Sequence, residues 1–273
     1  MAGRAVNGTE LFVESVGDGP ALVMMHGGLG LDHTYFRPAF DQLSDIANVV
    51  YYDHRGNGRS APLAEGGADL TLENLVADTV GLLDDLGIER ATLLGHSYGG
   101  FVAQLVAAAH PDRLSGLVLA NTVPAFDYAP EPSGTDEQLA AFGQLFSGPA
   151  EDDATWASLW RTIWPMYFHR WDDDEAARVD AGTHYRAAAW NASAGLLGTF
   201  NVLDDLPGLS MPTLVIGGAH DFITPPEPGA TRIAGLVPNA ELALFDNSGH
   251  YPFMEEHDGF FTRLRTFLSG ISG

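Results

Sequence analysis

A serine stands at the centre of the segment Gly95-His96-Ser97-Tyr98-Gly99, between an apolar run and a helix-like pattern. Small residues flank a serine where a strand turns sharply into a helix, and such a turn projects the hydroxyl away from the sheet. Free N–H groups at the start of that helix favour negative charge. We therefore predict that Ser97 is a catalytic nucleophile. The prediction depends on this context, because the five-residue pattern by itself often occurs by chance.

A serine nucleophile needs a base, and the base needs an acid that orients it. Around a turn of this kind the chain order is serine, acid, histidine. Asp221 follows the apolar run 213–216 and His250 follows the run 240–245, so both are expected at the sheet edge that carries Ser97. Two alternatives stay open at this stage, namely His220 as the base and Asp246 as the acid.

The reaction also needs donors for the negative charge that develops on a substrate oxygen. A glycine-rich segment, residues 26–30, directly follows the apolar run 21–25. A loop there can aim a backbone N–H at the oxygen, and we predict Gly28 as that donor, with the N–H of Tyr98 as the second. A phosphate-binding loop is excluded, because the segment has neither the lysine nor the spacing of one.

The charge balance excludes several other classes of function. The 273 residues include 13 basic and 36 acidic side chains, a net charge of −23, and every basic residue is arginine. Nucleic-acid binding is not expected from such a chain, and lysine-based catalysis is impossible. With no cysteine, disulfides, thiolate nucleophiles and cysteine-bound metals are also excluded. The remaining histidines lack metal-ligand spacing, so we expect no metal and no cofactor.

The location of the protein is predicted from what its sequence lacks. The first nine residues contain no apolar stretch typical of a signal peptide, and no apolar run is long enough to cross a bilayer. We expect a soluble, cytoplasmic protein that contacts no membrane and takes a small molecule, an ester or a short peptide, as substrate. The sequence leaves the oligomeric state open.

Apolar runs separated by helical patterns predict the elements that must position these residues. The predicted strands are 11–16, 21–25, 48–52, 91–94, 116–120, 213–216 and 240–245, and the predicted core helices are 71–86, 98–109 and 255–268. Near-continuous apolar strands indicate a mostly parallel sheet covered by helices on both faces, an α/β fold. Asn7-Gly8 is typical of a hairpin, so the N-terminal edge is expected to be antiparallel.

The alternation stops after Asn121, and the next predicted strand begins at Thr213. The segment between them has helical patterns, among them 135–146 with Thr135 and Gln138 as a capping box. We predict a core of residues 1–123 and 206–273 with a helical cap inserted at 124–205.

All five tryptophans of the chain belong to this cap. Trp156, Trp160 and Trp164 are four residues apart and share one helical face. They either pack the cap or form an apolar wall over a substrate, and we predict them as substrate contacts. Asp172 to Glu175 are interpreted as the start of a helix in solvent rather than a metal site.

Five motifs stand in the order and spacing of the α/β-hydrolase superfamily. They are His26-Gly-Gly, Asp53-His-Arg-Gly-Asn-Gly-Arg-Ser60, Gly95-His-Ser-Tyr-Gly-Gly100, Gly218-Ala-His-Asp221 with Thr224-Pro225, and Ser248-Gly-His250. The chain resembles the proline iminopeptidase-like branch and its esterase relatives, whose helical cap is inserted after the sixth strand. The resemblance implies that Arg55 and its neighbouring glycines brace the loop beside the active site.

The motifs also separate this chain from some branches of that superfamily. Haloalkane dehalogenases and epoxide hydrolases of this fold resemble the chain less, because they have aspartate at the position of Ser97. The lysine that hydroxynitrile lyases of this fold use is absent. Leu29 replaces the proline of the peptidases' His-Gly-Gly-Pro-Gly loop. We expect a cofactor-independent serine hydrolase acting on esters of small to medium apolar groups. The alternatives are an aminopeptidase and a non-catalytic binding protein on the same fold.

Overall fold

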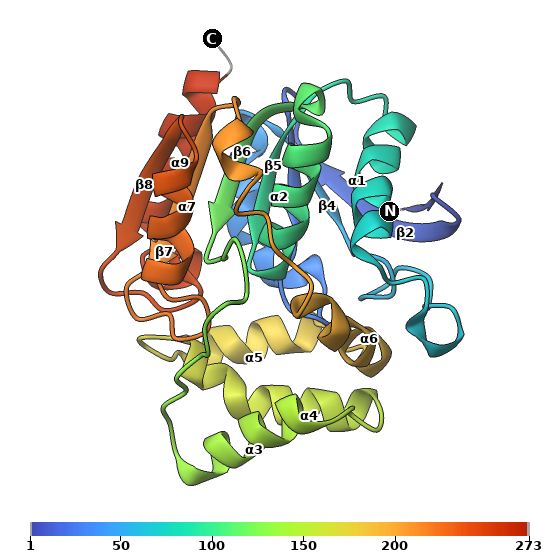
Figure 1. Cartoon of the computed structure of the whole chain (residues 1–273), viewed down its shortest axis with the longest axis vertical. Coiled ribbons are helices and arrows are strands. Elements are labelled where there is room, and N and C mark those ends of the chain that lie inside the picture. The colour runs from blue at the N-terminus through green and yellow to red at the C-terminus, as the bar shows by residue number, and fades with distance from the viewer. Residues whose placement is uncertain (1, 272–273) are drawn as a thin grey trace.

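The computed structural model describes residues 2–271, which form a twisted sheet with helices beside it and a separate helical layer (Figure 1). Within these residues the sheet has eight strands in the order β1-β2-β4-β3-β5-β6-β7-β8. The strands are β1 (Ala2–Val6), β2 (Thr9–Val16), β3 (Ala21–Met25), β4 (Asn48–Tyr52), β5 (Ala91–His96), β6 (Leu114–Ala120), β7 (Thr213–Gly218) and β8 (Ala240–Phe245). From β4 to β8 all neighbouring strands are parallel, which confirms the predicted α/β fold.

The N-terminal edge of the sheet is antiparallel, as the hairpin signal predicts. β1 pairs with β2, and β2 pairs with β4. Asn7 and Gly8 both have positive φ, 45° and 74°, which matches the twist of a two-residue hairpin. β1 was not predicted as a strand, because four of its five residues are small or charged and give no apolar alternation.

The core helices pack on the sheet through apolar faces, and capping residues mark the ends of α1 (Leu72–Asp85). This helix begins after Thr71, whose side chain accepts the N–H of Asn74, and Gly87 follows its end at φ 66°. α2 (Tyr98–Ala109) starts directly after Ser97 and is buried along most of its length. α7 (Arg232–Leu236) lies between β7 and β8 in the chain.

The predicted C-terminal helix 255–268 corresponds to α9 (His257–Ile271), which begins two residues later than predicted. The short helix α8 (Pro252–Glu255) precedes it, with non-helical backbone at Glu256. The break turns two carboxylates toward the preceding loop, where Glu255 accepts the N–H of Gly249 and Glu256 accepts the N–H of Asn247. These hydrogen bonds outweigh the continuous helical pattern and fix the loop that carries His250.

The helical layer lies across the carboxyl ends of the strands (Figure 1). It contains α3 (Asp136–Ser147), α4 (Asp153–Ile163), α5 (Asp173–Gly182) and α6 (Ala187–Leu197). The predicted capping box of Thr135 and Gln138 is confirmed, and Asp172 caps the N-terminus of α5. The two ends of the layer meet where Ala125 pairs with Asn201. We propose the division into a core of 1–123 and 206–273 and a cap of 124–205.

Among the described residues, every helix is too short or too polar to cross a membrane.

Candidate active site

Ser97 lies in the tight turn between β5 and α2, at φ 54° and ψ −120°, a conformation that is strained for a residue with a side chain. Neighbouring strands hold it there, because its N–H bonds to the carbonyl of Ala120 at 2.9 Å and its carbonyl accepts the hydroxyl of Thr122 at 2.9 Å. The turn requires close packing, since a Cβ at Gly99 would lie 2.0 Å from the carbonyl oxygen of Met25. The backbone therefore projects the Ser97 side chain at the sheet edge.

His250 and Asp221 approach this edge from the loops after β8 and β7. Nδ1 of His250 lies 2.7 Å from Oδ2 of Asp221. The buried carboxylate also accepts Nδ2 of Asn121 at 2.9 Å, Oγ1 of Thr224 at 2.6 Å, and the N–H groups of Ile223 and Thr224. Burial alone would raise the pKa of Asp221, but the charge and hydrogen bond of His250 and the bonds from Thr224 and Asn121 lower it to about 2. Asp221 is thus an anion beside the imidazole.

The two alternative residues lie elsewhere on the surface. His220 is exposed and stacks on His169 of the cap, with ring centroids 3.7 Å apart. Asp246 is exposed at the end of β8. The structure therefore brings Asp221, rather than Asp246, to the imidazole of His250.

Buried His96 links the loop of His250 to the glycine-rich loop. The N–H of Gly27 donates to the Tyr35 hydroxyl at 2.5 Å, and that hydroxyl lies 2.9 Å from Nδ1 of His96. Nε2 of His96 lies 2.8 Å from the carbonyl of His250. Burial lowers the pKa of His96 well below its usual value, so the ring is neutral. The Tyr35 hydroxyl then donates to Nδ1, and Nε2–H donates to His250.

His96, Tyr35 and Asn121 are part of the site although their local sequence patterns did not predict a role for them there. His96 is inside the predicted serine motif, and Asn121 directly follows β6, a position at the same edge as the other loops. Those two places are signals that could have found them. Tyr35 is distant from His96 in the sequence and contacts it only in the folded chain, so nothing in its local sequence indicates this contact.

The predicted oxyanion donors belong to the lining of the cavity that contains the serine. Gly28 and Tyr98 line the same cavity as Ser97 and His250. Tyr98 is the first residue of α2, where N–H groups have no partner within the helix. Gly28 has φ 68°, which favours glycine, in the loop that follows β3. Two N–H groups on one cavity wall can stabilise a negatively charged oxygen near Ser97.

This cavity has a volume of about 340 Å³ and lies between the sheet edge and the cap. Its walls are mainly aromatic, and they include Phe101, Phe126, Phe142, Trp156, Trp160 and Trp190. Within the described residues, no aspartate, glutamate or arginine is part of the lining. Such a space favours apolar groups and offers no counter-ion to a charged one.

The structure separates the three tryptophans predicted as substrate contacts. Trp156 and Trp160 line the large cavity, whereas Trp164 lines a smaller one of about 90 Å³ with Glu255. The ring of Trp164 still stacks on that of Trp160, with centroids 6.4 Å apart, but it lies outside the lining of the large cavity. Trp164 follows the end of α4 at Ile163 and begins a 3₁₀ turn. Pro165 is the sequence signal for this end. Trp190, which stacks on Trp156 at 4.7 Å, takes the corresponding place in the wall and was not predicted.

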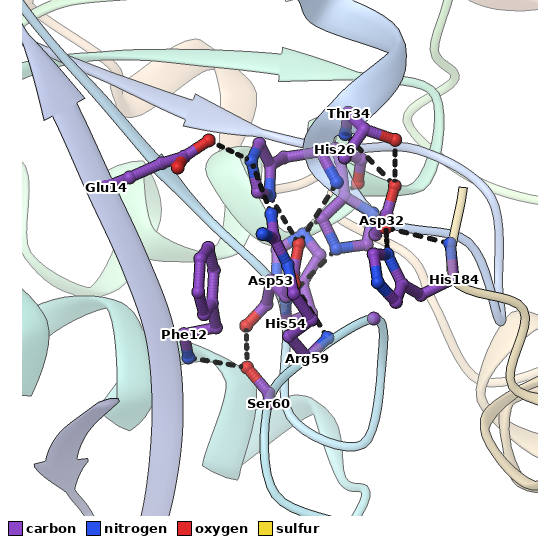
Figure 2. A network of polar contacts seen from close by, with 12 residues as sticks. Phe12, Glu14, His26, Asp32, Thr34, Asp53, His54, Arg59, Ser60 and His184 are labelled. Atoms are coloured by element: carbon purple, nitrogen blue, oxygen red, sulfur yellow. Dashed lines mark hydrogen bonds and ion pairs between the residues drawn. The ribbon is translucent and has the colours of Figure 1, made fainter. Parts of the chain in front are cut away.

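A buried network of charged groups supports the loop 53–60 from below (Figure 2). Asp53 accepts Nδ1 of His33 at 2.6 Å and the N–H of Arg59 at 2.8 Å, and Nε2 of His33 lies 2.8 Å from Glu14. Burial alone would lower the pKa of His33, but the hydrogen bonds to Asp53 and Glu14 raise it to about 9. An imidazolium between two carboxylates therefore joins this loop to β2.

Arg55 lies buried in the same loop and pairs with Asp78 of α1 through Nε at 2.9 Å and Nη2 at 2.6 Å. Its guanidinium also reaches the carbonyl of Asn7. A two-pronged pair of this kind fixes orientation as well as distance.

No group of three or more histidine, aspartate or glutamate side chains within residues 2–271 is arranged to hold a metal ion.

Comparison with known proteins shows the family to which the chain is similar. The model of the α/β-hydrolase fold family matches residues 20–257. Proline iminopeptidase PfmaB of Pestalotiopsis fici is 28% identical over 96% of this chain and 97% of its own length. The putative carbamate hydrolase RutD of a Caulobacter species is 30% identical over 91% of this chain and 90% of its own. The crystal structure of an enol-lactonase from Burkholderia xenovorans is 26% identical, with a TM-score of 0.78 over 98% of this chain and all of that one.

Proposed function

This chain belongs to the α/β-hydrolase fold family, and within that family we propose that it is a serine hydrolase which cleaves carboxylic esters of small to medium apolar substrates. One observation carries the proposal: Ser97 and His250 line a single, mainly aromatic cavity that also holds the predicted oxyanion donors. An ester fits this cavity without a charge to neutralise.

The proposed reaction proceeds through an acyl-enzyme. Ser97 Oγ attacks the ester carbonyl while His250 takes its proton, and Asp221 holds the resulting imidazolium. The N–H groups of Gly28 and Tyr98 stabilise the oxyanion. When the tetrahedral intermediate collapses, the proton passes from His250 to the leaving alcohol. A water molecule, deprotonated by His250, then attacks the acyl-enzyme. When this second tetrahedral intermediate collapses, His250 returns the proton to Oγ of Ser97 and the acid is released.

Similar proteins are named as a peptidase, a putative carbamate hydrolase and a lactonase, so their names do not agree on one substrate class. We therefore infer the substrate class from the cavity. An aminopeptidase must hold the ammonium group of its substrate, and a buried ammonium without a carboxylate is costly. Asp221 is a carboxylate of this site, but it is already hydrogen-bonded to His250 and cannot serve as the counter-ion. Asp172 to Glu175 lie at the start of α5, and Asp172 and Glu175 line the smaller cavity instead. The aromatic lining therefore favours an ester.

A panel of substrates tests this choice. The purified protein is assayed with p-nitrophenyl esters of increasing acyl length and with prolyl and alanyl arylamides. We expect hydrolysis of the esters, with kcat/KM rising along the series. A preference for either arylamide over every ester would favour the aminopeptidase, and no hydrolysis of any member would favour a binding protein.

A further inference from the structure

The cap meets the glycine-rich loop at the carbonyl group of Gly30. Nε1 of Trp156 donates to this oxygen at 3.1 Å, and the N–H of Arg186 donates to it at 2.8 Å. On the other side of the same residue, the N–H of Gly30 donates to Oδ1 of Asn57 at 2.8 Å. Both polar groups of Gly30 are therefore held from outside the loop, and two of the three bonds come from the cap.

The later part of the loop, residues 28–31, has little internal support. Gly28 to Leu31 form a turn whose own hydrogen bond, from the Leu31 N–H to the Gly28 carbonyl, is long at 3.5 Å. Gly30 has φ 88°, and a Cβ there would lie 2.5 Å from the Arg186 carbonyl and 2.8 Å from Nε1 of Trp156. The cap thus packs directly on the turn. The peptide unit that carries the Gly28 N–H is held on one side by Nδ1 of His26, which lies 2.8 Å from the Gly27 carbonyl. On its other side, one short backbone segment connects it to Gly30.

Trp156 has a fixed orientation for this bond. Its side chain is completely buried, and its ring stacks on Trp190 at 4.7 Å with 14° between the planes. The same ring lines the substrate cavity. A buried indole N–H needs an acceptor, and the acceptor of Trp156 is the carbonyl of Gly30 in the predicted oxyanion loop.

Other contacts keep the cap segment beside Arg186 in place. The N–H of His184 donates to Asp32 at 2.9 Å, and Nδ1 of His184 lies 2.8 Å from the same oxygen (Figure 2). Nε of Arg186 donates to the carbonyl of Gly58 at 2.9 Å. The cap is therefore joined to the loop after β3 and to the loop after β4.

We propose that Trp156 is a positioning residue of the oxyanion hole: its indole N–H fixes Gly30, and through Gly30 the direction of the Gly28 N–H. The role rests on the proposed serine-hydrolase function, because it concerns the same oxyanion. It also means that one side chain both contacts the substrate and sets the donor geometry, so the cap must be seated for the hole to be complete.

The test removes the indole N–H and keeps an aromatic ring, in Trp156→Phe. Trp171→Phe is the matched control, because the Trp171 indole of the same cap donates to Asp173 at 2.6 Å and lies outside the cavity lining. Three quantities are measured for each variant: kcat and KM on a p-nitrophenyl ester, and Ki for an alkylboronic acid, which forms a tetrahedral adduct with an oxygen in the oxyanion position. A second variant with 3-benzothienylalanine at position 156 keeps the bicyclic ring without the N–H.

We expect kcat of Trp156→Phe to fall about 10-fold and the boronate Ki to rise about 10-fold, with KM changed by less than about threefold. The control should keep all three values. A kcat and Ki within twofold of the control, in both position-156 variants, would overturn the proposal and leave Trp156 as a wall residue.

Hydrogen exchange gives a readout that does not require activity. Peptides covering residues 26–31 should exchange faster in Trp156→Phe than in wild type or Trp171→Phe, because the loop loses an anchor. Unchanged exchange would contradict the proposal. If wild type hydrolyses no ester, the proposed function fails, while the exchange comparison still decides whether Trp156 holds the loop.

Discussion

Replacing Asp221 by asparagine should nearly abolish turnover, and the hydrogen bonds of this carboxylate show why. Oδ1 accepts two backbone N–H groups, from Ile223 and Thr224, so the amide oxygen of an asparagine must take that position. The new NH₂ group then replaces Oδ2 and faces Nδ1 of His250, 2.7 Å away in the wild type. Two donors cannot pair, so His250 must accept at Nδ1 and keep its proton on Nε2.

An imidazole with its proton on Nε2 cannot take the proton of Ser97. The same NH₂ group would also face Nδ2 of Asn121, a second donor at 2.9 Å. We expect kcat of Asp221→Asn to fall by about 10⁴-fold, equivalent to about 5.4 kcal/mol of transition-state stabilisation.

The assay is steady-state hydrolysis of a p-nitrophenyl ester, with circular dichroism to show that the fold is kept. Asp246→Asn is the control, because Asp246 is exposed and lies in the same loop as His250. It should retain activity within about twofold. More than a tenth of wild-type kcat in Asp221→Asn would refute the tautomer reasoning, and a larger loss in Asp246→Asn would transfer the acid role to that residue.

Three further predictions follow from the same geometry. Ser97→Ala should lower kcat by about 10⁴-fold or more while the melting temperature is kept within a few degrees; retention of a tenth of the activity would remove Ser97 from the nucleophile role. Each CH₂ added to the acyl chain should raise kcat/KM up to about fourfold until the cavity is full. Trp160→Ala should flatten this dependence on chain length, whereas Trp164→Ala, at the smaller cavity, should not. Equal chain-length profiles in both variants would contradict the assignment of Trp160 to the cavity wall. Protonated His33, whose pKa is raised to about 9, stabilises the fold fully below about pH 6.5, and this stabilisation is lost as pH rises through 9. Urea unfolding should therefore show a loss of about 3 kcal/mol that His33→Gln lacks, and the same loss in the variant would assign it to other groups.

The residues at strand ends could be predicted from the sequence because their positions depend on local patterns. The apolar run 91–94 followed by small residues places Ser97 in a turn, and the order of strands places the loops of Asp221 and His250 at one edge. The fold class follows from the same alternation of strands and helices. These are properties of short segments, and the packing of the rest of the chain did not alter them.

The cap could be predicted less well, because its contacts join segments that are distant in the sequence. Trp190 reaches the cavity by stacking on Trp156, 34 positions earlier in the chain, and no local spacing indicates that contact. The bond from Trp156 to Gly30 spans 126 positions. Trp164 continues the row of rings beyond Trp160 but lines the smaller cavity, and helical periodicity alone does not show where the large cavity ends.

We propose that Ser97 carries an acyl group during ester hydrolysis. Mass spectrometry of the protein, quenched early in its reaction with a p-nitrophenyl ester, detects such a group directly. The absence of lysine makes background acylation low, because side-chain amines are missing. We predict a single added acyl mass, mapped to the peptide that contains Ser97 and missing from Ser97→Ala. Turnover by wild type with the acyl group on another residue, or equal turnover by Ser97→Ala, would contradict the claim.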